Sequence, residues 1–481
     1  MESKTIKESG YFWWRNEPIP EDDIVPESAV AGDLIITDDG RISIELHGYL
    51  PSADHPMSRI FVGSGNSCPD IEGRLKNSSE HVLLTDVYTQ GGKASFGGIS
   101  YENYGATNCL IGSKPLPESK GEIMFDGLSI PLTGFEDWLG LGSIETSRTK
   151  RKLVATHKTQ KNIKYTLEDS STISVEFDLL APMFGNQKNH AINITEKISF
   201  KYLPKLKKTS SELKKYFFSI TDFFLILTGS DYNMEWPSLT IGRTASNTKS
   251  YRFYFLRSKN SAAPPTRHNC LLTFPTIREE FGHLFQQWQI KREELGPGMS
   301  LYLGTRRGVE LYVEHRFVNL IWGLESLHRT LNKDAPPTKL ELKAQRIIGQ
   351  ITLAKDRKWL EAKLEHSAEP SLAERLVECI KLLPLNFPAE SLRDFCNECA
   401  GKRNDISHFG GQRAPGGYGD FLGKIYSLNN ALSNIYPAII LKLCGVNDLL
   451  LLNMLSTGRA SSRIKYTLNE VGLHIKQGEL N

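Results

Sequence analysis

The sequence predicts an α+β multidomain protein with a β-rich N-terminal domain, a mixed α/β middle segment and a C-terminal all-α helical bundle. Three observations predict this fold class. Short strand-like runs separated by turn residues fill residues 1–205, and a capped helical run opens the segment 206–300. Apolar residues then recur at helical spacing over residues 301–456. The remaining residues, 457–481, are expected to form a tail or an edge element.

The clearest strand signal of the first domain lies between residues 32 and 46. Two strand-like runs there flank Asp39-Gly40, a dipeptide that favours the tight turn of a β-hairpin. Further strand-like runs follow at residues 81–87, 121–125, 152–156, 164–167, 172–179 and 191–200. Short strands with such regular turns are typical of a sandwich or an open barrel.

The middle segment mixes helix and strand. Residues 210–228 form a helical pattern that begins at a serine pair and ends before Gly229. Strand-like runs follow at residues 238–241 and 251–256, and a second helix is expected over residues 276–289.

The C-terminal segment has the pattern of a helical bundle. Its first helix carries apolar residues at helical spacing and ends before Pro336-Pro337. Further helices are expected at residues 340–354, 372–383, 391–402, 421–443 and 448–456. The glycines between residues 410 and 419 predict a flexible loop, and the absence of a Gly-Lys-Ser/Thr ending excludes a phosphate-binding loop there.

Charge and cysteine content limit the class of protein. The 481 residues have a net charge of only +3, so any contact with nucleic acid must come from local patches. Seven cysteines without a framework spacing favour free thiols in a reducing compartment. The sequence has neither a secretory leader nor an apolar run of membrane-spanning length. We therefore expect a soluble, cytoplasmic protein that does not contact the membrane.

One motif suggests chemistry. Residues 403–408 read Arg-Asn-Asp-Ile-Ser-His and follow the predicted helix 391–402. This run resembles the signature of the HEPN superfamily, an Arg, a polar residue and a His after four to six intervening residues. The alternative is an Arg and a His that lie on the surface near a helix end without a catalytic role.

A second resemblance lies at the other end of the chain. The runs Gly-Tyr-Phe-Trp-Trp at 10–14, Val-Ala-Gly-Asp-Leu at 30–34 and Asp-Gly-Arg-Ile-Ser-Ile-Glu-Leu at 39–46 are similar to the N-terminal domain of ApeA-type anti-phage proteins. This resemblance implies abortive-infection defence by an RNA-cutting HEPN domain, with tRNA as one target and a phage-derived trigger as a partner. The front half would act as a sensor or a restraint.

The chemistry of the motif needs neither a metal nor a cofactor. His408 suits proton transfer as acid and base, and the guanidinium of Arg403 suits the charge that develops on the phosphate. On a continuous helix these two residues lie about 140° apart. They converge if the helix breaks between them or if two copies meet, and the resemblance implies the second solution, a homodimer through the C-terminal domain. Asn404 lies four residues before His408 and is expected to orient its ring.

Three more residues are candidates for substrate binding. Lys402 precedes the motif, Arg413 lies in the glycine-rich loop, and Glu325 lies on the first helix of the bundle. For Glu325 the resemblance implies a polar residue that faces the active cleft, whereas an ordinary exposed glutamate is the alternative. Asp405 is expected to be a solvated carboxylate. The rival function is a HEPN module without catalysis, which binds RNA or nucleotide or scaffolds a partner of the β-rich domain.

Other patterns have structural explanations that we favour. Cys396 and Cys399 have the spacing of half a zinc site but lack a second pair, so two buried thiols explain them better. The basic runs 148–164 and 201–215 can contact phosphates or form solvated faces. Trp13-Trp14 fits packing in the core or at an interface better than stacking on bases.

Overall fold

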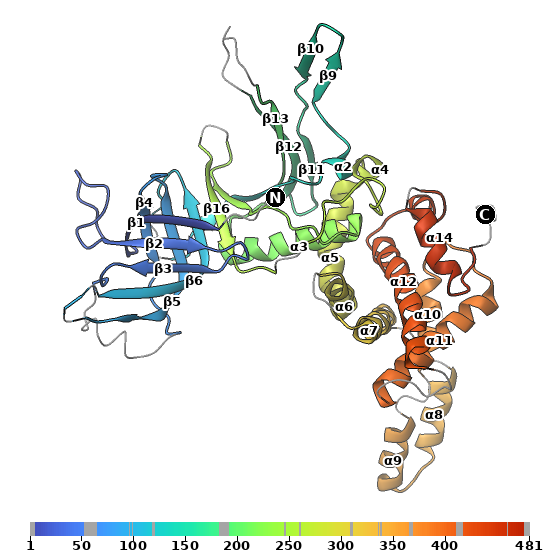
Figure 1. Cartoon of the computed structure of the whole chain (residues 1–481). Helices are drawn as coiled ribbons and strands as arrows, with labels where there is room; N and C mark the ends of the chain where they lie inside the picture. The colour runs from blue at the N-terminus through green and yellow to red at the C-terminus, as the bar shows by residue number, and fades with distance from the viewer. Residues whose placement is uncertain are drawn as a thin grey trace. The chain divides into compact units, whose positions relative to one another are not determined.

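The computed structural model of the chain divides into two compact units, coloured along the chain in Figure 1. The first comprises residues 1–221 and 232–264, and the second comprises residues 222–231 and 265–481. The structure describes residues 5–51, 65–95, 97–98, 100–117, 121–181, 192–244, 247–258, 261–307, 311–334, 336, 339–364, 369–409, 417–458 and 460–475.

The first unit begins with a closed six-stranded antiparallel barrel. Its strands are β1 (Ile6–Trp14), β2 (Val30–Ile36), β3 (Ile42–Leu46), β4 (Ile71–Leu75), β5 (His81–Lys93) and β6 (Tyr101–Gly112). They follow the order β6-β3-β2-β1-β4-β5, and a direct β5–β6 pairing closes the ring. The predicted β-rich fold class is confirmed, and the pairing of β5 with β6 makes the barrel closed rather than open.

The barrel fills its interior by alternation along the strands. In β2 and β3 the residues that point inward are apolar and buried: Leu34, Ile36, Ile42, Ile44 and Leu46. The predicted hairpin connects these strands, with Ile36 opposite Ile42. Gly40 has a φ of 83°, and a Cβ there would lie 2.0 Å from the carbonyl oxygen of Phe255. The turn therefore requires glycine for both its conformation and its packing.

The tryptophan pair of β1 is part of this packing. Trp13 is 2% exposed, and Trp14 contacts the edge of Tyr104 at a ring-centroid distance of 5.7 Å. Trp13 is therefore buried, and Trp14 is partly buried and packs against the core of the barrel.

The sheet continues beyond the barrel through β6, which also pairs with β16 (Lys249–Phe255). The extension runs β16, β15 (Ser238–Ile241), β8 (Gly127–Pro131), β13 (Thr195–Leu203), β12 (Thr172–Leu180) and β11 (Ile163–Thr166). Two small sheets pair β9 (Ile144–Arg148) with β10 (Leu153–His157) and β7 (Met124–Phe125) with β14 (Lys208–Thr209). The short helix α2 (Glu136–Leu139) also belongs to this unit.

Helix α3 (Ser210–Thr228) matches the predicted helix and contains the division between the units. The second unit is helical, as predicted. Its elements are α4 (Phe274–Ile277), α5 (Phe281–Leu295), α6 (Pro297–Arg306), α7 (Val313–Leu331), α8 (Lys339–Gly349), α9 (Ala354–Leu364), α10 (Leu372–Ile380), α11 (Ala389–Phe409), α12 (Tyr418–Leu443), α13 (Asp448–Leu452), the π-helix η1 (Asn453–Thr457) and α14 (Ser461–Asn469). Among the described helices, none combines the length and apolar character needed to cross a membrane.

Helix α7 lies at the centre of this bundle and packs against α6, α10, α11 and α12. Its apolar stripe is fully buried at Phe317, Leu320, Ile321, Leu324 and Leu327. Two details differ from the sequence-based expectation. The helix expected over residues 276–289 is divided into α4 and α5, and the segment after Thr457 contains α14, whose Ile464 and Leu468 are buried. That segment is therefore partly anchored in the core of the bundle.

Candidate active site

Helix α11 carries the whole Arg-Asn-Asp-Ile-Ser-His run without a break. The helix therefore does not break between Arg403 and His408 to bring them together. Cys399 is buried and marks the side of α11 that faces the bundle. Measured around the helix axis from Cys399, Arg403 lies at about 40° and His408 at about 180°. Arg403 thus points toward the bundle, and His408 lies exposed on the opposite face of the helix.

Arg403 is held by three neighbours. Its Nη2 lies 3.6 Å from Oε2 of Glu325, and its Nη1 donates a hydrogen bond of 3.1 Å to Oδ1 of Asn404. Its guanidinium carbon lies 6.0 Å from the ring centroid of Trp322. The side chain is only 22% exposed, and its Nε is buried without a hydrogen-bond partner among the described residues. Because this nitrogen is enclosed, a ligand can reach only the part of the guanidinium side chain that is exposed.

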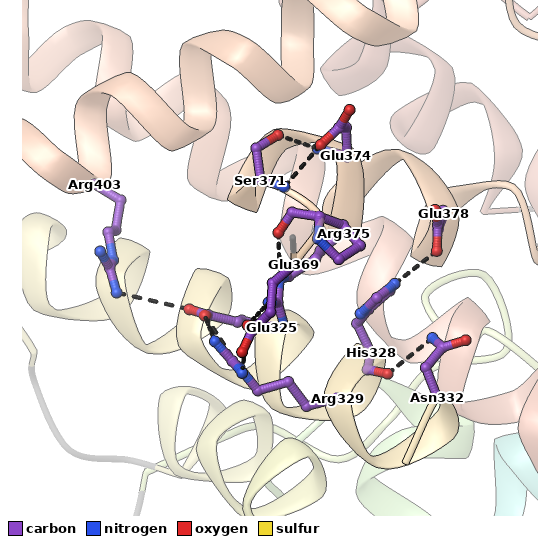
Figure 2. A network of polar contacts seen from close by, with 11 residues as sticks. Glu325, His328, Arg329, Asn332, Glu369, Ser371, Glu374, Arg375, Glu378 and Arg403 are labelled. Atoms are coloured by element: carbon purple, nitrogen blue, oxygen red, sulfur yellow. Dashed lines mark hydrogen bonds and ion pairs between the residues drawn. The ribbon is translucent and has the colours of Figure 1, made fainter. Parts of the chain in front are cut away.

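Glu325 connects Arg403 to a chain of alternating charges (Figure 2). Its Oε1 accepts from Arg329 at 3.2 Å, and Arg329 reaches Glu369 at 2.9 Å. Glu369 also pairs with Arg375, whose side chain is 6% exposed and whose Nε donates to the carbonyl oxygen of Pro370. Because each carboxylate lies between two guanidinium groups, the network fixes the side chain of Glu325 and, through it, that of Arg403.

The remaining predicted site residues are Lys402, Asn404 and Arg413. Lys402 lies with its Nζ 5.0 Å from the ring centroid of Phe421 on α12. Asn404 is exposed and accepts a hydrogen bond from Arg403, so its side chain contacts the guanidinium. Arg413 lies outside the described residues. The structure thus brings Arg403, Asn404 and Glu325 together and leaves His408 on another face.

Sequence reasoning missed most of this network. The pair Glu325 and Arg329 has the i, i+4 spacing of a helical ion pair and could have been found. Glu369 and Arg375 had no such signal, because their contact with α7 depends on how α10 packs against it. Trp322 is an exposed aromatic residue whose position beside Arg403 follows only from the packing of α11 on α7.

A second histidine of the bundle is not a candidate for acid–base catalysis. His328 is 4% exposed, and its Nε2 lies 2.6 Å from Oε2 of Glu378. Since the imidazole is enclosed, no substrate can reach it.

The cysteine pair of α11 is part of the core. Cys396 and Cys399 are fully buried, and burial raises the pKa of the Cys396 thiol to about 12 and the pKa of Cys399 well above its usual value. Among the described residues, no three His, Cys, Asp or Glu side chains form a group that could hold a metal ion. The geometry thus favours buried thiols over half a zinc site.

The pairing of Arg403 with Glu325 can be measured by a double-mutant cycle of Arg403→Ala and Glu325→Gln. Both side chains are about one-fifth exposed, so we expect a coupling free energy of about 0.5–1 kcal/mol in urea unfolding. The matched control is Arg393→Ala, which removes an exposed arginine from the same helix and should show no coupling with Glu325→Gln. Equal coupling in both cycles would mean that the contact with Glu325 does not hold Arg403.

Two family profiles match the chain. The family described as ApeA N-terminal domain 1 matches residues 7–288, more than half of the chain. The family described as Apea-like HEPN matches residues 318–449, which include most of α7, all of α11 and the Arg403–His408 run. No curated protein and no solved structure matches the chain. The chain therefore belongs to the ApeA family, as an ApeA-type protein with a C-terminal HEPN domain.

Proposed function

We propose that this defence-associated HEPN protein is a metal-independent endoribonuclease that cuts RNA through attack by the ribose 2′-hydroxyl. The observation that carries the proposal is Arg403, an arginine of the HEPN domain that Glu325 and Asn404 hold with 22% of its side chain exposed. A phosphate oxygen can accept a hydrogen bond from the exposed part of this guanidinium, because a guanidinium offers forked donors that match a phosphate.

In this mechanism His408 performs the proton transfers. Its exposed imidazole can take the proton of the 2′-hydroxyl and return one to the departing 5′-oxygen. Arg403 stabilises the charge that develops on the phosphorane. Glu325 is then a positioning residue, since its carboxylate contacts the guanidinium and is not proposed to contact the substrate.

The separation of the two residues on α11 leads to a dimer. A single helix places them about 140° apart, so one chain presents them to a phosphate poorly. Two copies related by a two-fold axis would present two pairs to one cleft. Helix α12 supports such an interface, because the rings of Tyr418 and Tyr426 are more than half exposed. The same helix lies beside the motif helix, since Lys424 pairs with Glu398 of α11 at 3.2 Å. Host RNA such as tRNA is the proposed substrate, and a phage-derived component is the proposed trigger.

The separation of Arg403 and His408 around α11 also favours a second candidate function. If no dimer forms, the motif would be a binding surface, and the protein would bind RNA or nucleotide, or scaffold a partner, without cutting. This reading predicts RNA binding without new RNA ends.

Cleavage in the presence of EDTA separates these functions. We expect purified protein to cut RNA at an unchanged rate in excess EDTA and to leave 2′,3′-cyclic phosphate or 3′-phosphate ends, because attack by the 2′-hydroxyl produces them. End-labelled products resolved before and after phosphatase treatment provide the measurement. Products with 3′-hydroxyl ends, or activity that EDTA abolishes, would instead indicate a metal-dependent nuclease.

A further inference from the structure

Helices α8 and α9 form a hairpin that projects from the rest of the helical unit (Figure 1). The two helices pack mainly against each other. No residue of α9 is buried, and its Trp359 is 61% exposed, as is Leu353 just before the helix. Helices of 11 residues are marginal in water unless something packs on them. The hairpin therefore has a surface that suits a binding partner.

The two faces of α9 differ in chemistry. Leu360 and Leu364 are partly buried and form the side that faces α8. On the opposite side, successive turns of the helix align one set of residues, which we call the α9 stripe: Lys355, Lys358, Trp359, Ala362 and Lys363. The two carboxylates of the helix, Asp356 and Glu361, flank this stripe and do not interrupt it. The stripe is thus a continuous basic surface with one aromatic ring near its centre.

The charges of the stripe are available to a partner. The ammonium groups of Lys355, Lys358 and Lys363 are exposed, and none of them forms an ion pair with another described residue. A second copy of the same surface would be repelled by them. Lysines spaced along a helix around an exposed tryptophan match single-stranded nucleic acid, in which phosphates alternate with bases that can stack on a ring.

We propose that the α9 stripe binds single-stranded RNA, with the three lysines on phosphates and Trp359 stacked on an unpaired base. This inference rests on the proposed function for its biological meaning, since RNA held by the stripe would be retained by the domain that cuts it. The physical claim concerns binding and is independent of cleavage.

The test measures binding of an unstructured single-stranded RNA oligonucleotide to full-length protein with the His408→Ala substitution, which prevents cleavage. The triple variant Lys355→Glu/Lys358→Glu/Lys363→Glu should lose at least about tenfold in affinity, and the slope of log K against log salt should fall by about 2, since each phosphate contact on a single strand contributes about 0.7. Trp359→Ala should weaken binding by about fivefold or more without changing the slope.

The matched control changes the same charge elsewhere on the helical unit. Lys333, Lys381 and Arg393 are exposed, so Lys333→Glu/Lys381→Glu/Arg393→Glu should leave the affinity within about twofold and the slope unchanged if the stripe is the site. Equal losses in both triple variants would overturn the proposal in favour of a diffuse charge effect. Unchanged RNA binding, together with lost binding to phosphatidylserine vesicles, would overturn it in favour of a lipid surface.

The two proposals fail in different ways. If RNA binding depends on the α9 stripe but the protein does not cut RNA, the inference about the stripe stands and the proposed nuclease function is wrong. If the protein cuts RNA but its RNA affinity does not change when the α9 stripe is altered, the inference about the stripe is wrong and the proposed nuclease function stands.

Discussion

Replacement of His408 by Ala is expected to lower RNA cleavage about 10²- to 10⁴-fold, the usual contribution of a positioned acid–base group. His408 lies exposed on α11, so its loss should change the free energy of unfolding by less than about 0.5 kcal/mol. Single-turnover cleavage and urea unfolding of the same preparation measure both quantities. The matched control is His315→Ala, which removes an exposed imidazole from α7 in the same unit and should cut at the wild-type rate.

Arg403→Ala is expected to reduce cleavage by a similar factor, because it removes the cation that faces the phosphate. Arg403→Lys keeps the charge but loses the planar fork, so its rate should lie between those of wild type and Arg403→Ala. A variant of either residue that cuts as fast as wild type would remove that residue from the mechanism. A His315→Ala variant as slow as His408→Ala would point to a general loss of structure.

Local signals account for the parts of the fold that could be predicted. The Asp39-Gly40 turn depends on the backbone of one glycine, and it appears where expected between β2 and β3. Helix α3 ends at Gly229, whose φ of 69° suits the left-handed conformation that terminates helices. Such features are encoded within a few residues, so a single sequence is enough to find them.

Non-local pairing accounts for the parts that could not. Strand β6 is buried along most of its length and pairs with β3, β5 and β16, so its residues show no clean alternation. Closure of the barrel by β5 and β6 follows from that pairing. The contact of Glu369 with Arg329 likewise joins residues 40 positions apart through the packing of α10, which no local pattern encodes.

The candidate site likewise has features that the sequence predicts and features that it does not. The residue types of the motif and their 140° separation follow from the sequence and helix geometry. The pairing of Arg403 with Glu325, and the exposure of His408, depend on which face of α11 turns toward α7. That face is set by Cys396 and Cys399, which are buried on the same side of the helix as Arg403.

A mixed dimer of wild-type and Arg403→Ala chains is expected to cut RNA at well below half the wild-type rate. The reason is geometric, since α11 is continuous and one chain presents Arg403 and His408 on different faces. A site shared across a two-fold axis loses one of its two guanidinium groups in every mixed dimer, so no intact site is left. Coexpression of two differently tagged chains, followed by two affinity steps, isolates the mixed dimer for single-turnover measurement.

The control for this experiment is a mixed dimer of wild-type and Arg393→Ala chains. Arg393 is an exposed arginine of the same helix, outside the motif, and its loss should leave the wild-type rate. If the Arg403→Ala mixed dimer cuts at half the wild-type rate, each chain carries its own independent site. If the protein is a monomer that still cuts RNA, Arg403 and His408 must act within one chain. Either result would contradict the shared cleft, because the face on which His408 lies could then no longer be explained by a partner subunit.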